Sequence, residues 1–348
     1  MAKASPKKRG KRIALIVLIV FLALIFVVMS ALAFYVTYLY NKIDFVENET
    51  TVSPEQASSI ALEDAETIDP DNSDPLLNQN DVEVEDEDVN HLGQGDHIVN
   101  IMLVGQDARK GERVQRSDSM MLVTFNTNTK TITLTSLMRD QYVKIPGYGS
   151  TKLNHAYQYG GMSLMNETLY NHFGIEIDGN FEVDFSGFED IIDLLGGVEI
   201  DLTKKEVAYL KEKGCKNIQP GKNVLAGKWA LWYARLRSID TDYARAERQR
   251  NVMMSLFEAY KELSYTEMLS LLHEILPLLR TNMTLPQITN FAMDLYPMFS
   301  DAKVETLRIP VDGTFKGGYV KVSEGLKLWC QYDIDFEANR EVLNKIFE

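Results

Sequence analysis

Five arginines lie close together in the stretch YARLRSIDTDYARAERQR, and no lysine interrupts them. They are Arg235, Arg237, Arg245, Arg248 and Arg250. A guanidinium is a planar fork of hydrogen-bond donors that stays charged, which suits the oxygens of a phosphate group. On a helix, Arg245, Arg248 and Gln249 would share one face, because they are three and four residues apart. A turn before this helix would bring Arg235 and Arg237 toward that face and form a phosphate clamp.

The same stretch has a second interpretation, because Asp240, Asp242 and Glu247 are interleaved with the arginines. An arginine-rich helix with alternating charges is more often a solvated face held together by ion pairs. The stretch alone favours this second interpretation. The remaining residues of the chain change that balance.

Further charged residues are placed at the ends of predicted strands. They are Asp107 and Arg109, then Arg116 and Asp118, and then Arg139 and Asp140. Sites in open α/β sheets usually form from the loops at strand ends. Asp107 and Asp118 can together hold one Mg²⁺, because this ion is commonly bound by one or two carboxylates with phosphate oxygens and water. Taken singly, each charged residue is better explained as a turn residue or a helix N-cap.

The segment TKLNHAY contributes two more polar candidates, Lys152 and His155. Lys152 can add a point charge to a phosphate site, although a solvated lysine is the default interpretation. His155 is interpreted as a structural residue rather than a ligand.

The pattern of apolar residues predicts the elements that must position these side chains. Strands are predicted at 97–104, 120–125, 131–137, 180–184, 198–202, 304–310 and 319–322. Helices are predicted at 161–173, 188–195, 251–263, 267–279 and 335–347, with another starting at 284. Capping boxes at 186–189 and 203–206 mark two helix starts. Because strands and helices alternate, we expect an α/β fold, with a layered sheet and helices on its faces, rather than a bundle or sandwich.

The predicted helices at 251–263 and 267–279 are rich in methionine and leucine, for example Met253, Met254, Leu256 and Met268. Most of these side chains are expected to lie in the core. Beside a cluster of arginines, the same composition would also suit an apolar slot for a lipid tail. Both interpretations stay open here.

The N-terminus predicts a membrane anchor. Residues 1–12 are basic, residues 13–40 carry no charge, and Tyr35, Tyr38 and Tyr40 cluster at the far end of this run. A run of this length can cross a bilayer, its basic flank stays in the cytoplasm, and tyrosines favour the membrane interface. A signal peptide cleaved near 31–33 is the alternative, but the apolar run continues past that site. We therefore expect an uncleaved transmembrane helix, with the rest of the chain outside.

Residues 41–96 predict an acidic, disordered tether, because 44–96 contain no lysine or arginine and few aromatic residues. The chain's net charge of −14 is concentrated there, so it does not favour nucleic acid as a ligand. Residues 97–348 are long enough for one large folded domain. Its two cysteines, Cys215 and Cys330, can pair or be buried thiols, and their spacing excludes a cysteine-based zinc motif.

Six motifs, taken in order, resemble those of the LytR-CpsA-Psr family of cell-wall enzymes. They are VGQDAR, RSDSMML, SLMRD, TKLNHAY, FSGFEDIIDLLGGVEIDL and YARLRSIDTDYARAERQRNV. Several ordered motifs within 98–263, behind a matching membrane anchor, are far more specific than any one of them. The departures are small: Gln106 occupies a variable position, and Ala244 stands where the family often has glycine.

The resemblance implies a mixed central β-sheet sandwiched between α-helices, on the outside of a Gram-positive cell. It also implies a phosphotransferase that takes an anionic glycopolymer, such as teichoic acid or capsular polysaccharide, from an undecaprenyl-pyrophosphate carrier. The polymer would then be attached to peptidoglycan through a phosphodiester. Magnesium would be the cofactor, and no nucleic acid partner is implied.

By motif, the resemblance also assigns roles to individual residues of this chain. Asp107 and Asp118 would be the magnesium-associated carboxylates. The pyrophosphate-binding arginines would be Arg116, Arg139, Arg235, Arg237 and Arg245. Lys152 and Gln249 match supporting, substrate-binding positions.

The chemistry of phosphoryl transfer agrees with this set of residues. Forked arginines and a metal ion can neutralise the developing charge without a covalent residue on the protein, and Asp107 can take the proton from the attacking sugar hydroxyl. Two alternatives belong to other classes: a regulatory protein resembling a transcriptional attenuator, and an envelope protein that binds lipid or glycan without turnover. The predicted topology counts against the first, because the domain would have no access to DNA. The two aspartates beside the arginines count against the second.

Overall fold

The computed structural model divides the chain into two compact units, Met1–Asp44 and Phe45–Glu348. It describes residues 37–38, 41, 44–45, 49, 51–68, 76–79, 82, 92, 94–107, 116–261, 263–264, 267, 270–271, 274–299 and 301–348. The predicted transmembrane helix at 13–40 lies outside these residues, apart from Thr37 and Tyr38. Within the described part of the chain, no helix has the length and apolar character needed to cross a membrane.

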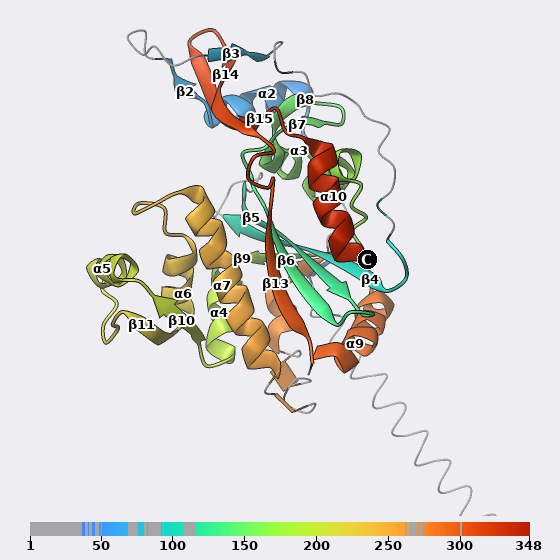
Figure 1. Cartoon of the computed structure of the whole chain (residues 1–348), viewed down its shortest axis with the longest axis vertical. Coiled ribbons are helices and arrows are strands. Elements are labelled where there is room, and N and C mark those ends of the chain that lie inside the picture. Colours follow the sequence, from blue (N-terminus) through green and yellow to red (C-terminus); the bar gives the residue numbers. More distant parts are fainter. Residues whose placement is uncertain are drawn as a thin grey trace, which may run out of the picture. The chain divides into compact units, whose positions relative to one another are not determined.

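A mixed β-sheet forms the centre of the second unit (Figure 1). Its strand order is β1-β12-β9-β4-β5-β6-β13. The bounds are Asp44–Phe45 for β1, Ile98–Asp107 for β4, Arg116–Asn126 for β5, Thr131–Leu137 for β6, Gly179–Asp184 for β9, Arg280–Thr281 for β12 and Lys303–Ile309 for β13. Strands β4, β5 and β6 pair antiparallel, whereas β9 pairs parallel with β4 and β13 parallel with β6. The predicted α/β fold with a mixed central sheet is therefore confirmed.

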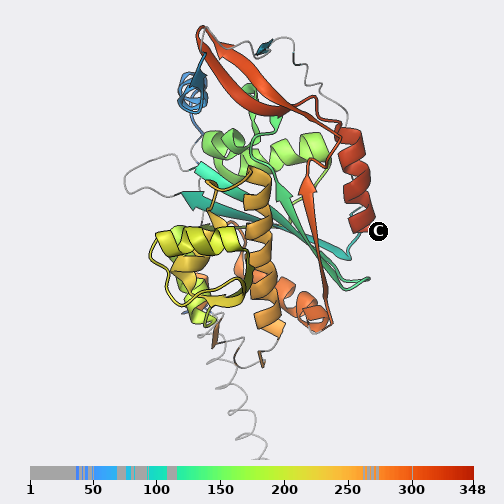
Figure 2. The same cartoon turned by 60° about the vertical axis from the view of Figure 1, so that its left-hand side comes forward.

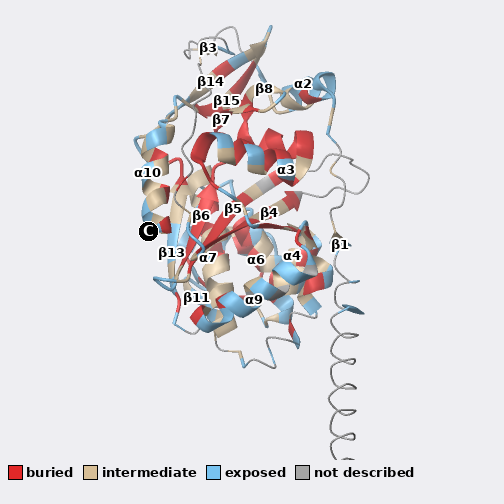
Figure 3. Cartoon of the chain, turned by 90° about the vertical axis from the view of Figure 1, so that its right-hand side faces the viewer, coloured by how far each residue is buried: buried red, intermediate tan, exposed pale blue. Residues whose placement is uncertain are grey.

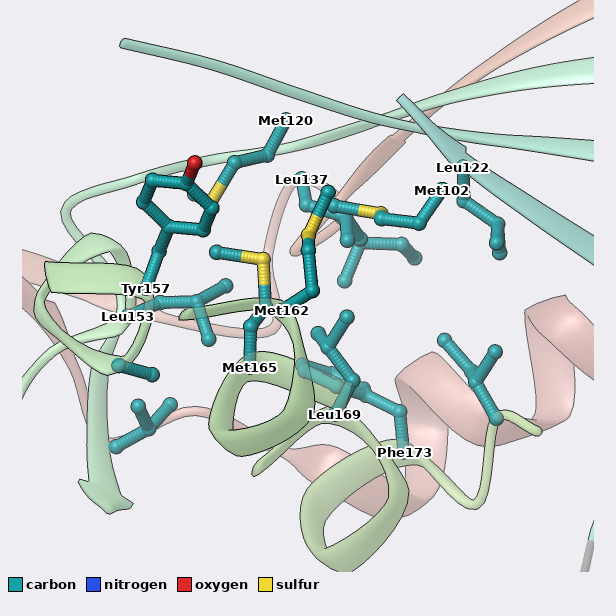
Figure 4. Packing of buried hydrophobic residues seen from close by; sticks show 14 of the residues in the cluster. Met102, Met120, Leu122, Leu137, Leu153, Tyr157, Met162, Met165, Leu169 and Phe173 are labelled. Atoms are coloured by element: carbon teal, nitrogen blue, oxygen red, sulfur yellow. The ribbon is translucent and has the colours of Figure 1, made fainter. Parts of the chain in front are cut away.

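Both faces of this sheet are covered by helices, because its strands carry apolar side chains on both faces. On one face, Met102 packs in a cluster with residues of α3 (Leu153–Phe173) and α10 (Phe336–Phe347). Figure 3 shows both helices beside the sheet, and Figure 4 shows Met102 in one cluster with α3 residues such as Met162 and Met165. On the other face, Ile101 packs with residues of α7 (Asp242–Lys261) and α9 (Leu285–Phe299). Neighbouring residues of one strand thus serve two separate cores.

A smaller module follows the central strands and has its own core, which includes Ile192, Ile200 and Leu210. Its elements are α4 (Phe185–Leu194), β10 (Val198–Leu202), α5 (Lys204–Glu212), β11 (Gly221–Leu225) and α6 (Gly227–Ala234). Strands β10 and β11 pair as an antiparallel ribbon. Figure 2 shows this module projecting beside α7.

The two predicted capping boxes have different outcomes. The one at Thr203 is confirmed, because Thr203 caps α5 and the Glu206 side chain accepts from the Thr203 backbone N–H at 2.8 Å. The one at 186–189 is wrong, because α4 begins earlier and Asp184 caps it by accepting from the Gly187 N–H at 2.7 Å. The carboxylate at the last residue of β9 was the stronger start signal.

Part of the predicted tether is folded, which differs from the expected disorder. Helix α2 (Pro54–Glu63) begins with a capping box at Ser53 and Gln56, and its Ala57 is buried in the core against α3. Short strands β2 (Glu66–Thr67) and β3 (Leu76–Asn78) join a sheet with β14 (Lys316–Ser323) and β15 (Leu326–Tyr332). The S-P-E-Q start of α2 was a local signal that the acidic composition obscured.

Helix α3 holds this early segment through polar contacts. The helix is interrupted at Gly160 and Gly161, and the Glu49 carboxylate accepts from the exposed N–H groups of Met162 and Ser163 at 2.6 and 2.8 Å. At the start of the helix, Nε2 of the buried His155 contacts the Asp64 carboxylate at 3.2 Å. The interpretation of His155 as a structural residue agrees with this contact. The hairpin of β7 (Tyr142–Ile145) and β8 (Gly149–Lys152) leads directly into α3.

The two cysteines are free and buried, in different clusters. The sequence left a disulfide and two buried thiols as alternatives, and the structure favours the thiols. Burial raises the pKa of the Cys330 thiol to about 12 and also raises the pKa of Cys215. Both thiols are therefore poor nucleophiles at neutral pH.

Candidate active site

A cavity of about 430 Å³ lies between the central sheet and helices α4, α6 and α7. Much of its wall is apolar, with Phe181 from β9, Phe188 from α4, Leu231 from α6, and Met253 and Leu256 from α7. Its polar wall residues include Ser119, Arg235, Arg237, Arg245 and Gln249. For Met253 and Leu256, this arrangement agrees with the second interpretation of the 251–263 stretch, in which it lines an apolar slot beside the arginines.

Arg245 is the most informative residue of the cavity. Its Nη2 lies 2.8 Å from a carboxylate oxygen of Asp242, one turn earlier on α7. Only 4% of the residue is exposed, and its buried Nε and Nη1 have no hydrogen-bond partner among the described residues. Unpaired buried donors are rare in folded proteins and call for an explanation. Two unpaired donors of one guanidinium at a cavity wall fit an anionic ligand.

Asp242 is shared by three of the predicted arginines. Besides Arg245, its carboxylate lies 3.5 Å from Nε of Arg139 and 3.6 Å from Nε of Arg237. The ion-paired interpretation of this stretch is thus correct for Asp242. The pairing nevertheless gathers the arginines at one place, so the two interpretations do not exclude each other.

Lys152 joins the same network from the start of α3. Its Nζ lies 2.8 Å from Asp140, and the Asp140 carboxylate also lies 3.5 Å from Nε of Arg139. Lys152 is buried rather than solvated. Burial of both charges strengthens this contact relative to a surface ion pair.

The two ends of the arginine stretch are placed differently. Arg235 lines the cavity, and its guanidinium lies 4.0 Å from the centre of the Phe185 ring. Arg248 is buried against Glu206 and Asp240 and donates to the Leu236 carbonyl, so it braces α5 and the turn before α7. Arg250 donates to Ser136 on β6 at 2.8 Å. The predicted common face therefore holds for Arg245 and Gln249 but not for Arg248.

Three predicted site residues at the strand ends, Asp107, Arg116 and Asp118, are placed by their backbones alone, because the structure does not describe their side chains. Asp107 ends β4 and pairs with Arg116 at the start of β5, next to a register shift between Gly105 and Gln106. Asp118 precedes Ser119, whose hydroxyl donates to Oε1 of Gln249 at 3.1 Å. The strand ends therefore lie beside the arginine-bearing helix. Magnesium binding by Asp107 and Asp118 stays a prediction.

A buried polar cluster beside these strand ends was missed in the sequence. The Gln106 amide donates to both Tyr157 and Glu182, and Nη1 of Arg280 lies 3.2 Å from Glu182. Burial raises the pKa of the Glu182 carboxyl, although Arg280 opposes this shift. In the sequence, Glu182 looks like the polar side of an alternating strand. Partners that are distant in the sequence, Gln106 of β4, Tyr157 of α3 and Arg280 of β12, surround it in the folded chain.

These features together fit an amphipathic anion, because guanidinium donors of Arg245 that lack a described partner lie next to an apolar cavity. The LytR_cpsA_psr family model matches residues 58–329, and the chain belongs to this family. The resemblance of the six motifs is thereby confirmed.

The relatives of this chain include several transferases. The chain is 33% identical over 229 residues to the polyisoprenyl-teichoic acid–peptidoglycan teichoic acid transferase TagT of Bacillus subtilis (strain 168), which covers 64% of this chain and 70% of TagT. A structure of TagT bound to LIIa-WTA matches 78% of this chain and 97% of that chain, with a TM-score of 0.57 and 28% identity. The LytR-CPS2A-psr family protein YwtF (TagT) with bound octaprenyl pyrophosphate lipid has the same coverage, a TM-score of 0.54 and 26% identity.

We predict that Glu182→Gln changes the pH dependence of stability. A carboxyl whose pKa is raised by folding favours the folded state below its unfolded pKa, and this advantage is lost as the pH rises through the folded pKa. Glutamine does not titrate. The melting temperature of Glu182→Gln minus that of the parent should therefore increase between pH 4 and pH 8. Glu341→Gln on the exposed side of α10 corrects for the loss of one negative charge. A difference that stays flat or decreases would contradict the assignment.

Proposed function

We propose that this protein is a phosphotransferase that moves an anionic glycopolymer from an undecaprenyl-pyrophosphate carrier to peptidoglycan. The observation that carries the proposal is the pair of buried Arg245 donors, which lie beside an apolar cavity and have no partner within the part of the chain that the structure describes. The apolar wall fits a polyprenyl chain, and the guanidinium donors fit a pyrophosphate. The names of the relatives and the lipid bound to YwtF (TagT) support this assignment.

The arrangement suggests how the residues act in the reaction. An acceptor hydroxyl would attack the phosphorus next to the glycan, the bond to the bridging oxygen would break, and undecaprenyl phosphate would leave. Arg139, Arg237 and Arg245 meet at Asp242 and would stabilise the charge on the pyrophosphate oxygens as it shifts. The carboxylate of Asp107 would accept the proton of the acceptor hydroxyl. The product is a phosphodiester between glycopolymer and peptidoglycan.

Magnesium is a further part of the proposal. Two carboxylates at adjoining strand ends, Asp107 on β4 and Asp118 on β5, form a donor set that fits a hard divalent cation. When bound, the ion would supply positive charge to the pyrophosphate oxygens. The side chains of Arg139 and Arg245 would orient the same group.

We also propose that the domain lies on the outer side of the cell membrane of a Gram-positive cell, behind an uncleaved signal anchor. This proposal rests on the basic residues at 1–12 and the uncharged run at 13–40. Peptidoglycan as the acceptor requires the same orientation.

We predict that Arg245→Lys abolishes most of the transfer of lipid-linked polymer by the purified protein. Lysine keeps the charge but loses the fork of donors, and removing one preorganised donor typically costs on the order of 3 kcal/mol, about a hundredfold in rate. Thermal stability should stay close to that of the parent. Arg250→Lys, on the same helix but bonded to Ser136, is the matched control and should keep its activity. Full transfer by Arg245→Lys would contradict the proposed role.

We predict that Asp118→Asn lowers turnover and weakens its dependence on added Mg²⁺, because it removes one of two carboxylate ligands. The measurement is the initial rate of transfer as a function of Mg²⁺ concentration after treatment with a chelator. Asp301→Asn, at an exposed ion pair with Lys130, serves as the control. Equal rates with and without chelator would refute the metal assignment.

We predict that a cysteine at position 73 reacts with a membrane-impermeant thiol reagent on intact cells, because this position follows the anchor. Cys215 and Cys330 are replaced by alanine in the test protein, so that position 73 carries its only thiol. Both native cysteines are buried. Reaction only after lysis would place the domain on the cytoplasmic side.

A further inference from the structure

The stretch from 203 to 230 is basic, although the chain as a whole has a net charge of −14. It contains two glutamates, Glu206 and Glu212, and seven exposed lysines. Two of these lysines are ion-paired, Lys213 with Glu212 at 3.1 Å and Lys222 with Glu199 of β10 at 2.7 Å. The lysines are Lys204, Lys205, Lys211, Lys213, Lys216, Lys222 and Lys228. This stretch spans α5, β11 and the start of α6. We call the surface formed by α5, the loop at 213–220, β11 and α6 the basic module.

Aromatic rings accompany these lysines. Trp229 and Trp232 are three residues apart on α6, and 38% of Trp232 is exposed. Nζ of Lys213 lies 5.3 Å from the ring centre of Tyr209 and 6.0 Å from that of Trp232. Nζ of Lys228 lies 5.0 Å from the ring centre of Trp229. The exposed ring of Trp232 and the half-buried rings of Tyr209 and Trp229, next to cations, offer apolar surface for sugar rings and positive charge for their anionic substituents.

The basic module also contains a hollow of about 710 Å³. Its wall includes the amide side chains of Asn217, Gln219 and Asn223 together with Lys216, Lys222 and Trp229. The loop is held in place by the Asn223 amide, which donates to the carbonyls of Gln219 and Gly221 at 2.7 and 2.6 Å. The amide of Asn223 is occupied by these contacts, but those of Asn217 and Gln219, together with the ammonium groups, can bind hydroxyl and phosphate oxygens.

Helix α6 connects this hollow with the candidate active site. Ala226 and Trp229, at its start, line the hollow, whereas Ala234 and Arg235, at its end, line the apolar cavity. A helix of 8 residues is about 12 Å long, which is about the length of two or three sugar units. A polymer whose pyrophosphate lies at the arginines would therefore reach the basic module within its first few units.

We propose that the basic module binds the anionic chain of the glycopolymer donor, as an extended subsite beyond the pyrophosphate. This inference rests on the proposed function and specifies the part of the substrate that the module recognises. Repeated phosphates along the chain match these exposed lysines, five of which lie outside the Lys213–Glu212 and Lys222–Glu199 ion pairs, better than the uncharged sugar backbone of peptidoglycan does. The other candidate, an anionic membrane surface, fits less well, because the hollow presents amide groups in a concavity rather than protruding apolar side chains.

The test uses the full-length protein in detergent micelles and the variant Lys213→Gln, Lys216→Gln, Lys222→Gln, Lys228→Gln. Two synthetic donors share the same lipid pyrophosphate and first disaccharide, and only one carries a chain of phosphodiester-linked units. For the long donor, KM should rise at least tenfold in the variant, and its dependence on salt should weaken. For the short donor, kcat/KM should stay within twofold of the parent.

The control variant removes the same number of charges from exposed lysines outside the module, at Lys303, Lys316, Lys321 and Lys345. It should retain the parent KM for the long donor. Equal losses in both variants, or equal losses with both donors, would overturn the proposal.

A direct binding measurement separates this proposal from the proposed function. A phosphodiester-linked glycan without lipid or pyrophosphate is titrated into each protein in a calorimeter. The parent should bind it more tightly than the lysine variant, even if neither donor were transferred. If the variant loses only its binding to vesicles with anionic lipids, the module is a membrane contact and the proposal is wrong.

Discussion

The carboxylate of Asp242 is the interaction on which the arrangement of the site depends. Three guanidiniums meet at this residue, and they come from the end of β6, the turn after α6, and α7. Two like charges about 4 Å apart repel by about 4 kcal/mol at an effective dielectric constant of 20. One negative charge offsets part of this repulsion and leaves an excess of positive charge for a ligand. The same residue that ties three elements together therefore preserves the affinity of the site for anions.

The two faces of the central sheet serve different purposes. The face covered by α3 and α10 is closed by a packed core around Met102 and Met165. The opposite face carries α7 and α9 and, toward the module of α4 and α6, encloses the apolar cavity. A packed layer on one side can keep the strand ends rigid while the other side holds a ligand. This division agrees with the need for preorganised donors in phosphoryl transfer.

The sequence predicted the site where local rules apply. Arg245 and Gln249 are one helical turn apart, so their common face follows from the sequence. Arg248 was placed wrongly, because partners distant in the sequence, such as Glu206, bind its guanidinium. Glu182 was missed for a similar reason, since its strand alternates as a half-exposed strand would and α3 covers it from elsewhere in the chain. Helix α2 was missed because an acidic composition outweighed a good capping box at Ser53.

In the proposed topology, the contact between Glu49 and the interrupted helix α3 limits the length of free chain between the anchor and the folded domain. If the predicted anchor ends at Tyr40, at most eight residues separate it from the point where Glu49 is bonded to the domain. Eight residues span about 28 Å when fully extended. A disordered segment through residue 96 would instead have allowed the domain to sample a deep layer of cell wall. If the proposed anchor is correct, this short connection would hold the attachment point at Glu49 close to the bilayer that would contain the lipid carrier.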